Sequence, residues 1–328
     1  MRIDPEADSR TDAIEFVGQP VNRPECVLCT RTGHFYSSDW RGGVAHHHPD
    51  GSQTLYSAQL DDGRPLRPNG FAMQRDGSFL LADLGDTEGG VFELRRDNTV
   101  RPFLQAVDSI ELPPTNFVLL DHQGRIWITV STRLQPRALG YNAGCRDGFI
   151  ILVDSDGARI VADGLGYTNE CVVSVDGKTL WVNETFGRRL SRFDIRPDGQ
   201  LVNQFVVTEF GTGIYPDGLA MDTSGDFWAT SIVSNRVVQV HPDGEQIVWL
   251  QDANPVYVEK AEEAYLAGCL GREHLDGIES RRLGSLSSLA FGGADLRTAY
   301  LGCLLGDHVG TIRMPAPGVA PAHWTFDG

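Results

Sequence analysis

Residues 216–228 read PDGLAMDTSGDFW: a polar residue, an apolar run, a turn ending in glycine, and a second apolar run with an aromatic residue. Gly225 follows the leading Asp217 by eight positions, and Trp228 comes three positions after the glycine. Short apolar runs separated by glycine-containing turns are typical of antiparallel strands. The stretch therefore predicts one hairpin of a β-rich fold.

The same pattern recurs roughly every 45–50 residues along the chain. The leading polar residues of the six units are Glu25, Asn69, Asn116, Asn169, Asp217 and Ser288. In five units a glycine follows eight positions later, whereas Leu296 takes that place in the sixth. An array of β-sandwiches or several small β domains is the alternative, but the fixed phase favours a six-bladed β-propeller, whose radial closure protects its strand edges.

We expect a single propeller domain over residues 11–328, preceded by a flexible segment at 1–10. Residues 11–18, TDAIEFVG, are predicted as a strand that completes the last blade and closes the ring. Residues 131–147 form an insertion in blade three, and residues 252–284 form another between blades five and six.

The second insertion contains a short helical stretch, because apolar residues recur there at helical spacing. The residues that carry this spacing are Val256, Ala261, Tyr265 and Leu266. Insertions on a propeller either run over one face and cover a site or pack against the side of a blade. Whether the two insertions form a lid stays open at this point.

The chain has 328 residues and a net charge of −16, which opposes binding to nucleic acid and to anionic membranes. No apolar run approaches the ~20 residues that span a bilayer, and the N-terminus lacks the pattern of a secretory signal. The six cysteines lie mostly in apolar runs, which indicates a reduced, cytoplasmic protein. The expected partner is a small-molecule substrate, and the oligomeric state stays open.

The six leading residues occupy equivalent positions around the propeller axis, so their side chains should meet at one end of the channel. All six carry a side-chain oxygen. Turn preference explains Asn, Asp and Ser, but Glu25 is not a turn former. Carboxylate and carboxamide oxygens are hard ligands that suit Ca²⁺, Mg²⁺ or Mn²⁺, with Zn²⁺ as a further alternative. Two carboxylates close together would also repel each other without a cation.

The sequence resembles the senescence marker protein, gluconolactonase and luciferin-regenerating enzyme family over roughly residues 16–315. Pro216–Asp222 with Gly225, and the pair Asn69-Gly70, match its motifs. The resemblance implies a six-bladed propeller with one divalent cation, most often Ca²⁺. It further implies that Glu25, Asn169 and Asp217 hold the ion and that Asn116 contacts the substrate beside it.

The function that the resemblance implies is metal-dependent hydrolysis of a lactone. Asp217 is then the expected catalytic base toward a water that the cation orients, and Asn116 would hold a ring or carbonyl oxygen of the substrate. Asn69, Glu170 and Ser288 are further expected substrate contacts. Cys26 and Val27 follow Glu25 where the family has Gly-Pro, and Pro114 stands where relatives can carry an arginine. These departures leave a sugar lactone and a less polar lactone or ester both open.

Two other functions remain open from the sequence: a phosphotriesterase-like hydrolase on the same scaffold, and a nonenzymatic propeller that binds calcium or another ligand. Three further features are interpreted as structural. His46-His47-His48 precedes a Pro-Asp-Gly turn and is interpreted as a solvated blade edge. Asp176 and Asp222 are interpreted as turn residues.

Overall fold

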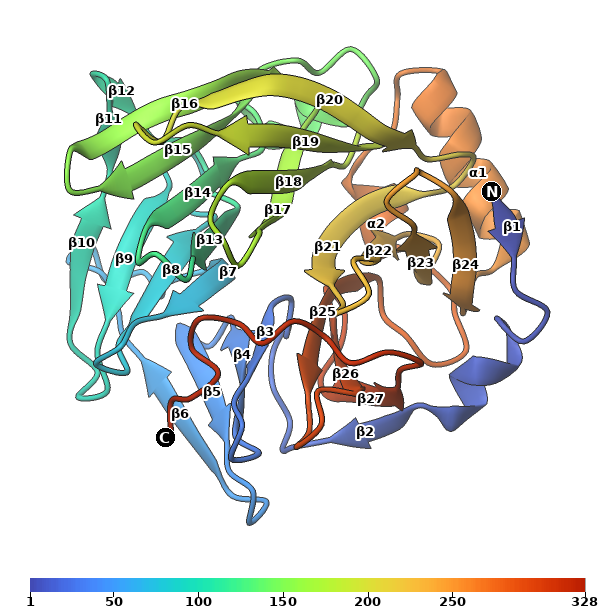
Figure 1. Ribbon diagram of the computed structural model, residues 1–328, viewed down its shortest axis with the longest axis horizontal. Helices are drawn as coiled ribbons and strands as arrows, with labels where there is room; N and C mark the ends of the chain where they lie inside the picture. Colours follow the sequence, from blue (N-terminus) through green and yellow to red (C-terminus); the bar gives the residue numbers. More distant parts are fainter. Residues whose placement is uncertain (328) are drawn as a thin grey trace.

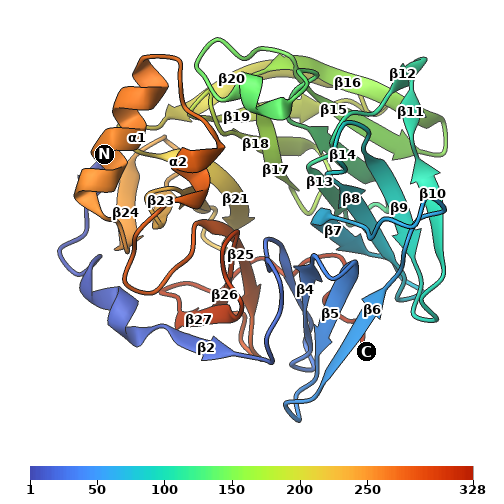
Figure 2. The same cartoon turned by 180° about the vertical axis from the view of Figure 1, so that it is seen from behind.

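Six blades, each with four antiparallel strands, surround a central axis in the computed structural model, which describes residues 1–327 (Figures 1 and 2). The predicted six-bladed propeller is confirmed. Blade one consists of β3 (Val27–Cys29), β4 (Phe35–Asp39), β5 (Gly43–His47) and β6 (Gln53–Ser57). Blade two consists of β7 (Pro68–Met73), β8 (Phe79–Asp83), β9 (Gly90–Leu94) and β10 (Val100–Leu104). Blade three consists of β13 (Phe117–Leu120), β14 (Ile126–Val130), β15 (Gly148–Asp154) and β16 (Gly157–Leu165).

The second half of the ring repeats this arrangement. Blade four consists of β17 (Thr168–Val173), β18 (Thr179–Glu184), β19 (Arg189–Ile195) and β20 (Leu201–Glu209). Blade five consists of β21 (Tyr215–Met221), β22 (Phe227–Ile232), β23 (Arg236–Val240) and β24 (Gln246–Gln251). Blade six consists of β25 (Leu286–Gly292), β26 (Thr298–Cys303), β27 (Val309–Arg313) and β2 (Glu15–Val17). A small hairpin of β11 (Ala106–Val107) and β12 (Ile110–Glu111) follows blade two.

The glycine that marks each repeat lies in the turn between the two innermost strands of its blade. Gly77 and Gly225 adopt φ angles of +83° and +91°, a left-handed conformation that glycine reaches without steric cost. Leu296, the exception in blade six, also has a positive φ, at +55°. The turn geometry is therefore kept in blade six even though the residue type is not.

The ring closes where the N-terminal part of the chain meets blade six. β2 pairs with β27 antiparallel, so that Phe16 lies opposite Gly310. The strand predicted within residues 11–18 is confirmed. Blade six thus joins a strand from the beginning of the chain to three strands from its end, which ties the two parts of the ring together.

The first ten residues, predicted as a flexible segment, make regular contacts with blade five. β1 (Arg2–Ile3) pairs parallel with β24, and η1 (Ser9–Ala13) follows it. Ala7 is buried, and its carbonyl accepts a hydrogen bond from the Gln251 amide. The prediction missed this pairing because the outer edge of β24 offers its unpaired backbone groups to any extended segment, whatever its side chains.

Helices gather on one face of the ring. α1 (Pro255–Leu266) and α2 (Arg272–Asp276) lie in the insertion between blades five and six, and η2 (Arg137–Gly140) lies in the insertion of blade three (Figure 2). The C-terminal chain after β27 crosses the opposite face (Figure 1). Among residues 1–327, no helix combines the length and apolar character needed to cross a membrane.

The predicted helical stretch is confirmed by α1, although its buried face differs in part from the predicted one. Ala261 and Tyr265 are buried as expected. Val256 and Leu266 are 77% and 74% exposed, because they lie at the two ends of the helix. The Asn254 side chain caps the helix by accepting from the backbone amides of Val256 and Tyr257.

Candidate active site

Five of the six leading repeat residues line one buried cavity on the propeller axis, with a volume of about 70 Å³. These residues are Glu25, Asn69, Asn116, Asn169 and Asp217. Each lies in the innermost strand of its blade or within two residues before it, and all five are buried. The predicted convergence is therefore confirmed for five positions.

Ser288 and Glu170, two of the expected substrate contacts, lie on the wall of a different cavity. That cavity, about 160 Å³ in volume, is lined mostly by apolar side chains of the innermost strands. The Glu170 carboxylate accepts a hydrogen bond from the Leu219 amide at 3.0 Å, and burial raises the pKa of Glu170 to about 8. Neither residue lines the axial cavity, although the Glu170 carboxylate is close enough to Asp217 to raise the pKa of Asp217.

Close approach of neighbouring blades at the axis explains why a glycine follows Asp217. A Cβ atom at Gly218 would lie 2.5 Å from the Ser287 carbonyl oxygen and 2.7 Å from the Ser288 Cα atom. The amide of Gly218 also donates to the Thr230 hydroxyl at 2.8 Å. The Asp-Gly pair thus holds blade five against blade six and fixes the backbone that carries the Asp217 side chain.

The three asparagines form a chain of side-chain hydrogen bonds around the cavity. Asn69 Nδ2 donates to Asn116 Oδ1 at 2.7 Å, and Asn116 Nδ2 donates to Asn169 Oδ1 at 2.7 Å. Asn169 Nδ2 donates in turn to the Thr185 hydroxyl at 2.9 Å. Because a carbonyl oxygen has two lone pairs, each Oδ1 that accepts one bond can still bind a second group.

The amide donors of two of these asparagines are fully engaged. Asn116 Nδ2 also donates to the Thr168 carbonyl at 3.3 Å, and Asn69 Nδ2 donates to the Asn116 carbonyl at 3.1 Å. With both N–H groups used, these side chains can only accept from a ligand. The prediction that Asn116 holds a ring or carbonyl oxygen of the substrate therefore does not fit this geometry, whereas a contact with a ligand hydroxyl does.

The carboxylates of Glu25 and Asp217 are the anionic part of the cavity wall. Arg23 Nη2 lies 2.9 Å from Glu25 Oε2, but the contact is not aligned as a hydrogen bond, and this buried oxygen has no other partner among the described residues. Burial raises the pKa of Asp217, the carboxylates of Glu25 and Glu170 raise it further, and Arg23 and Arg137 oppose the rise. An additional cation beside these oxygens would therefore be electrostatically favourable.

Several further residues that line the cavity were not predicted from the sequence. They are Arg23, Trp40, Arg137, Tyr141, Tyr167, Thr185 and Arg272. Arg23 and Tyr167 have φ angles of +58° and +68°, which is uncommon for residues other than glycine and is often found at functional sites. No sequence signal marks these two positions, because the strained backbone is imposed by the surrounding fold.

Both insertions contribute to the cavity, and this resolves the alternative that the sequence left open. Arg137 and Tyr141 come from the insertion at 131–147, and Arg272 comes from α2. α1 supports this cover, because the Tyr265 hydroxyl donates to the Phe186 carbonyl at 2.7 Å. The insertions therefore cover the site.

Arg137 places a cationic side chain at the cavity without an acidic partner. Its Nε donates to the Tyr167 hydroxyl at 2.7 Å, and its Nη2 lies 3.4 Å from the Ser131 hydroxyl. No carboxylate within residues 1–327 forms an ion pair with it, whereas Arg272 pairs with Asp276 at 2.7 Å. A guanidinium with unused donors at a cavity can bind an anionic or oxygen-rich group.

Comparison with known proteins gives related sequences and folds. The model of the SMP-30/gluconolactonase/LRE-like region matches residues 23–251. The chain is 26% identical over 244 residues to 6-deoxy-6-sulfogluconolactonase of Pseudomonas putida, which covers 72% of this chain and 77% of the relative. It is 24% identical over 286 residues to pentonolactonase XacC of Haloferax volcanii, covering 80% and 81% of the two chains.

Solved structures agree on the fold. A luciferin-regenerating enzyme superposes with a TM-score of 0.70 at 16% identity, covering 94% of this chain and 98% of that one. At this identity the likeness shows the propeller fold alone.

Proposed function

This chain belongs to the SMP-30/gluconolactonase/LRE-like family, and from that premise we propose that it hydrolyses lactones in the axial cavity with the help of one divalent cation. One observation carries the proposal: the oxygen-bearing side chains of Glu25, Asn169 and Asp217 line the same buried cavity. The names of the curated relatives, which are lactonases, support the reaction class.

The residues present fit a divalent cation. Glu25 Oε2 is buried without a hydrogen-bond partner, and Asn169 Oδ1 has a free lone pair beside the bond it accepts from Asn116. All three ligand side chains offer oxygen, which favours a hard ion, and Ca²⁺ is the one we propose. When bound, such an ion supplies Lewis-acid polarisation of a carbonyl and a lower pKa for a nearby water.

The side chains of the protein carry out the proton transfer that accompanies opening of the lactone ring. Asp217 accepts a proton from the water that attacks the lactone carbonyl carbon. The bond between the carbonyl carbon and the ring oxygen then breaks, and the ring oxygen takes up a proton, so that water and lactone become a hydroxy acid. Glu25 and Asn169 would hold the ion, and side chains of the two insertions line the cavity beside it.

The cavity wall favours a polar lactone over the less polar alternative. Asn69 and Asn116 retain only acceptor capacity, which matches hydroxyl groups on a substrate. Arg137 adds a cation without an acidic partner, which matches an anionic substituent. The Pseudomonas putida relative is named for a sulfonated gluconolactone, which supports this choice. We propose a hydroxylated sugar lactone that carries an anionic group.

Release of acid from a panel of lactones at low buffer strength tests the function. We expect turnover that a chelator abolishes and added Ca²⁺ restores. Asp217→Asn should lower kcat by roughly 10²–10⁴-fold, because the general base is lost. Asp226→Asn, a change at an acidic residue of the same hairpin that does not line the cavity, is the matched control.

The outcomes separate the alternatives. Turnover that survives complete metal removal would contradict the role of a cation. Metal-dependent turnover of a phosphotriester, without any of a lactone, would favour a phosphotriesterase-like enzyme. Tight Ca²⁺ binding without turnover of either substrate would favour a nonenzymatic protein.

A further inference from the structure

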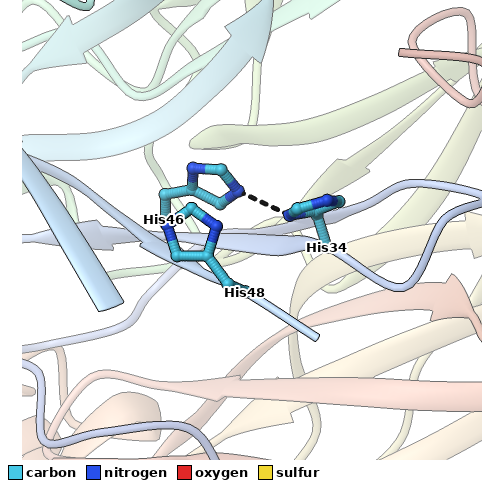
Figure 3. A group of neighbouring side chains, drawn as sticks. All are labelled: His34, His46 and His48. Atoms are coloured by element: carbon cyan, nitrogen blue, oxygen red, sulfur yellow. Dashed lines mark hydrogen bonds between the residues drawn. The ribbon is translucent and has the colours of Figure 1, made fainter. Parts of the chain in front are cut away.

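Three histidines of blade one form a cluster away from the axial cavity. One ring nitrogen from each of His34, His46 and His48 lies within 4.8 Å of those of the other two (Figure 3). His34 Nδ1 and His46 Nε2 share a hydrogen bond at 2.8 Å. The ring centroids of His46 and His48 are 3.9 Å apart. The three imidazoles therefore form one compact cluster.

The hairpin of β4 and β5 produces this cluster. His46 and His48 are two positions apart on one chain, so their side chains leave the same face of the sheet. The pairing register sets Phe35 opposite His47 and Tyr36 opposite His46, and one further step along the ladder brings His34 opposite His48. The intervening His47 faces the other way and stacks on Phe35 at 4.1 Å. The His-x-His spacing and the register thus place three imidazoles together.

Burial contradicts the interpretation of this tract as a solvated blade edge. His46 and His47 are only 2% and 1% exposed, because both belong to β5 in the interior of the blade. His34 and His48 are half-buried at the end of the hairpin. The cluster is therefore fixed from one side by the blade and accessible from the other.

One polar contact of the cluster supports a ligand site. His46 has its Nε2 on the side of His34, whereas its other nitrogen, Nδ1, is buried without a hydrogen-bond partner among the described residues and so gives that ring no outer support. The Thr54 hydroxyl lies 3.0 Å from His48 Nε2 and orients that ring, so the second ring nitrogen is the one that can bind an ion. Such hydrogen bonds to the outer nitrogen are the usual support of a metal-binding histidine.

From this geometry we infer that His34, His46 and His48 form a second metal site, selective for a transition-metal dication such as Zn²⁺. Three neutral imidazoles suit Zn²⁺ and its neighbours, whereas Ca²⁺ and Mg²⁺ prefer oxygen. Ligation at about 2.0–2.1 Å requires nitrogen atoms roughly 3.3 Å apart. The hydrogen-bonded nitrogens of His34 and His46 would therefore have to separate when the ion binds, and nitrogens that lie up to 4.8 Å apart would have to approach each other.

The site is separate from the axial cavity. Glu25 precedes β3, whereas His34 lies just beyond the turn at the far end of that strand. The C-terminal chain also reaches this end, since the Arg31 amide donates to the Trp324 carbonyl. Loss of the histidine site would therefore leave the ligands of the axial cavity in place, and the two sites can be tested independently.

Zn²⁺ titration of the full chain by calorimetry, in excess Ca²⁺ and without an affinity tag, tests the inference. We expect one equivalent of Zn²⁺ to bind. The double variant His34→Ala/His48→Ala should weaken this binding by roughly tenfold or more, whereas Asp217→Asn should not. Co²⁺ provides a second readout, because its visible absorption reports a nitrogen-ligated site and should disappear in the double variant.

His308→Ala, which removes a half-exposed histidine of blade six, is the matched control. Circular dichroism verifies folding, and His48→Gln alone replaces the double variant if the latter unfolds. Absence of Zn²⁺ binding by the native chain would overturn the inference. Equal binding by the histidine variants would overturn it as well, because the ion would then lie elsewhere.

Discussion

At the scale of single residues, Arg137 is the side chain whose effect on substrate preference can be tested separately from the bond-breaking step. It reaches the cavity from an insertion, lies against Tyr167, and pairs with no carboxylate of the described chain. A charge-assisted hydrogen bond to an anionic substituent is worth about 1.5–3 kcal/mol. Arg137 should therefore determine which lactone is preferred while leaving the bond-breaking step to Asp217.

We predict that Arg137→Met lowers kcat/KM for a lactone with a sulfonate or carboxylate group by roughly 10–100-fold. For the uncharged lactone of the same ring size the loss should be much smaller. Steady-state kinetics with the two substrates measures this difference. Arg192→Met, a change outside the cavity, is the matched control. Equal losses for both substrates would mean that Arg137 supports the fold of the cavity rather than its selectivity.

The leading residues of the repeat could be predicted from the sequence because a propeller relates them by rotation, so one position in the repeat is one place in space. Arg23, Arg137 and Arg272 could not be predicted in the same way. Arg23 precedes the first repeat and has a left-handed backbone conformation, whereas Arg137 and Arg272 lie in insertions that fold back over the face. Ser288 shows the limit of the repeat argument, since it occupies the right position but lines the neighbouring cavity.

At the scale of elements, the two turn aspartates that the sequence treats alike differ in burial. Asp222 is 1% exposed and accepts hydrogen bonds from the Ser224 amide at 2.8 Å and from the Trp228 indole at 2.9 Å. Asp176 is exposed and bonds only within its own turn, to Ser174 and Lys178. Both are turn residues, as predicted, but only Asp222 connects its turn to the core.

Asp222→Ala should therefore lower the free energy of unfolding by roughly 2–4 kcal/mol, because it leaves buried N–H groups without an acceptor. The measurement is urea-induced unfolding followed by tryptophan fluorescence. Asp176→Ala is the matched control, with a smaller expected loss. If the two variants lost the same free energy, the bond to Trp228 would contribute nothing beyond the turn itself.

At the scale of the whole molecule, the number of blades and the closing strand follow from the repeat, but the C-terminal cap does not. The chain after β27 crosses the end of the channel opposite the helices (Figure 1). The Val319 amide donates to the Met221 carbonyl, and His122 Nε2 lies 3.1 Å from the Ala320 carbonyl. This segment has no periodicity to detect, because it lies across several blades instead of forming one.

The cap places a histidine where its charged form is disfavoured. His323 lines the apolar cavity of the channel, and its Nε2 is buried without a hydrogen-bond partner among the described residues. Burial lowers the pKa of His323 to about 4, with a smaller contribution in the same direction from the nearby His122 and an opposing one from a hydrogen bond with the Cys29 backbone. In the unfolded chain an ordinary histidine binds its proton near pH 6.5. The unfolded state therefore binds more protons than the folded state between these two values.

Because the folded pKa is depressed, the stabilisation by the neutral histidine is complete above pH 6.5 and is lost as the pH falls toward 4. We predict that His323→Gln reduces the loss of unfolding free energy between pH 7.5 and pH 5 by about 1–2 kcal/mol, a value discounted for the partial exposure of the ring. Urea unfolding at the two pH values measures it. His46 and His47, whose pKa values are lowered by burial to about 3 and about 4, contribute to the loss in both proteins. The difference in pH dependence between the native chain and the variant therefore reports His323 alone. An unchanged pH dependence of the unfolding free energy in the variant would show that protonation of His323 does not affect stability.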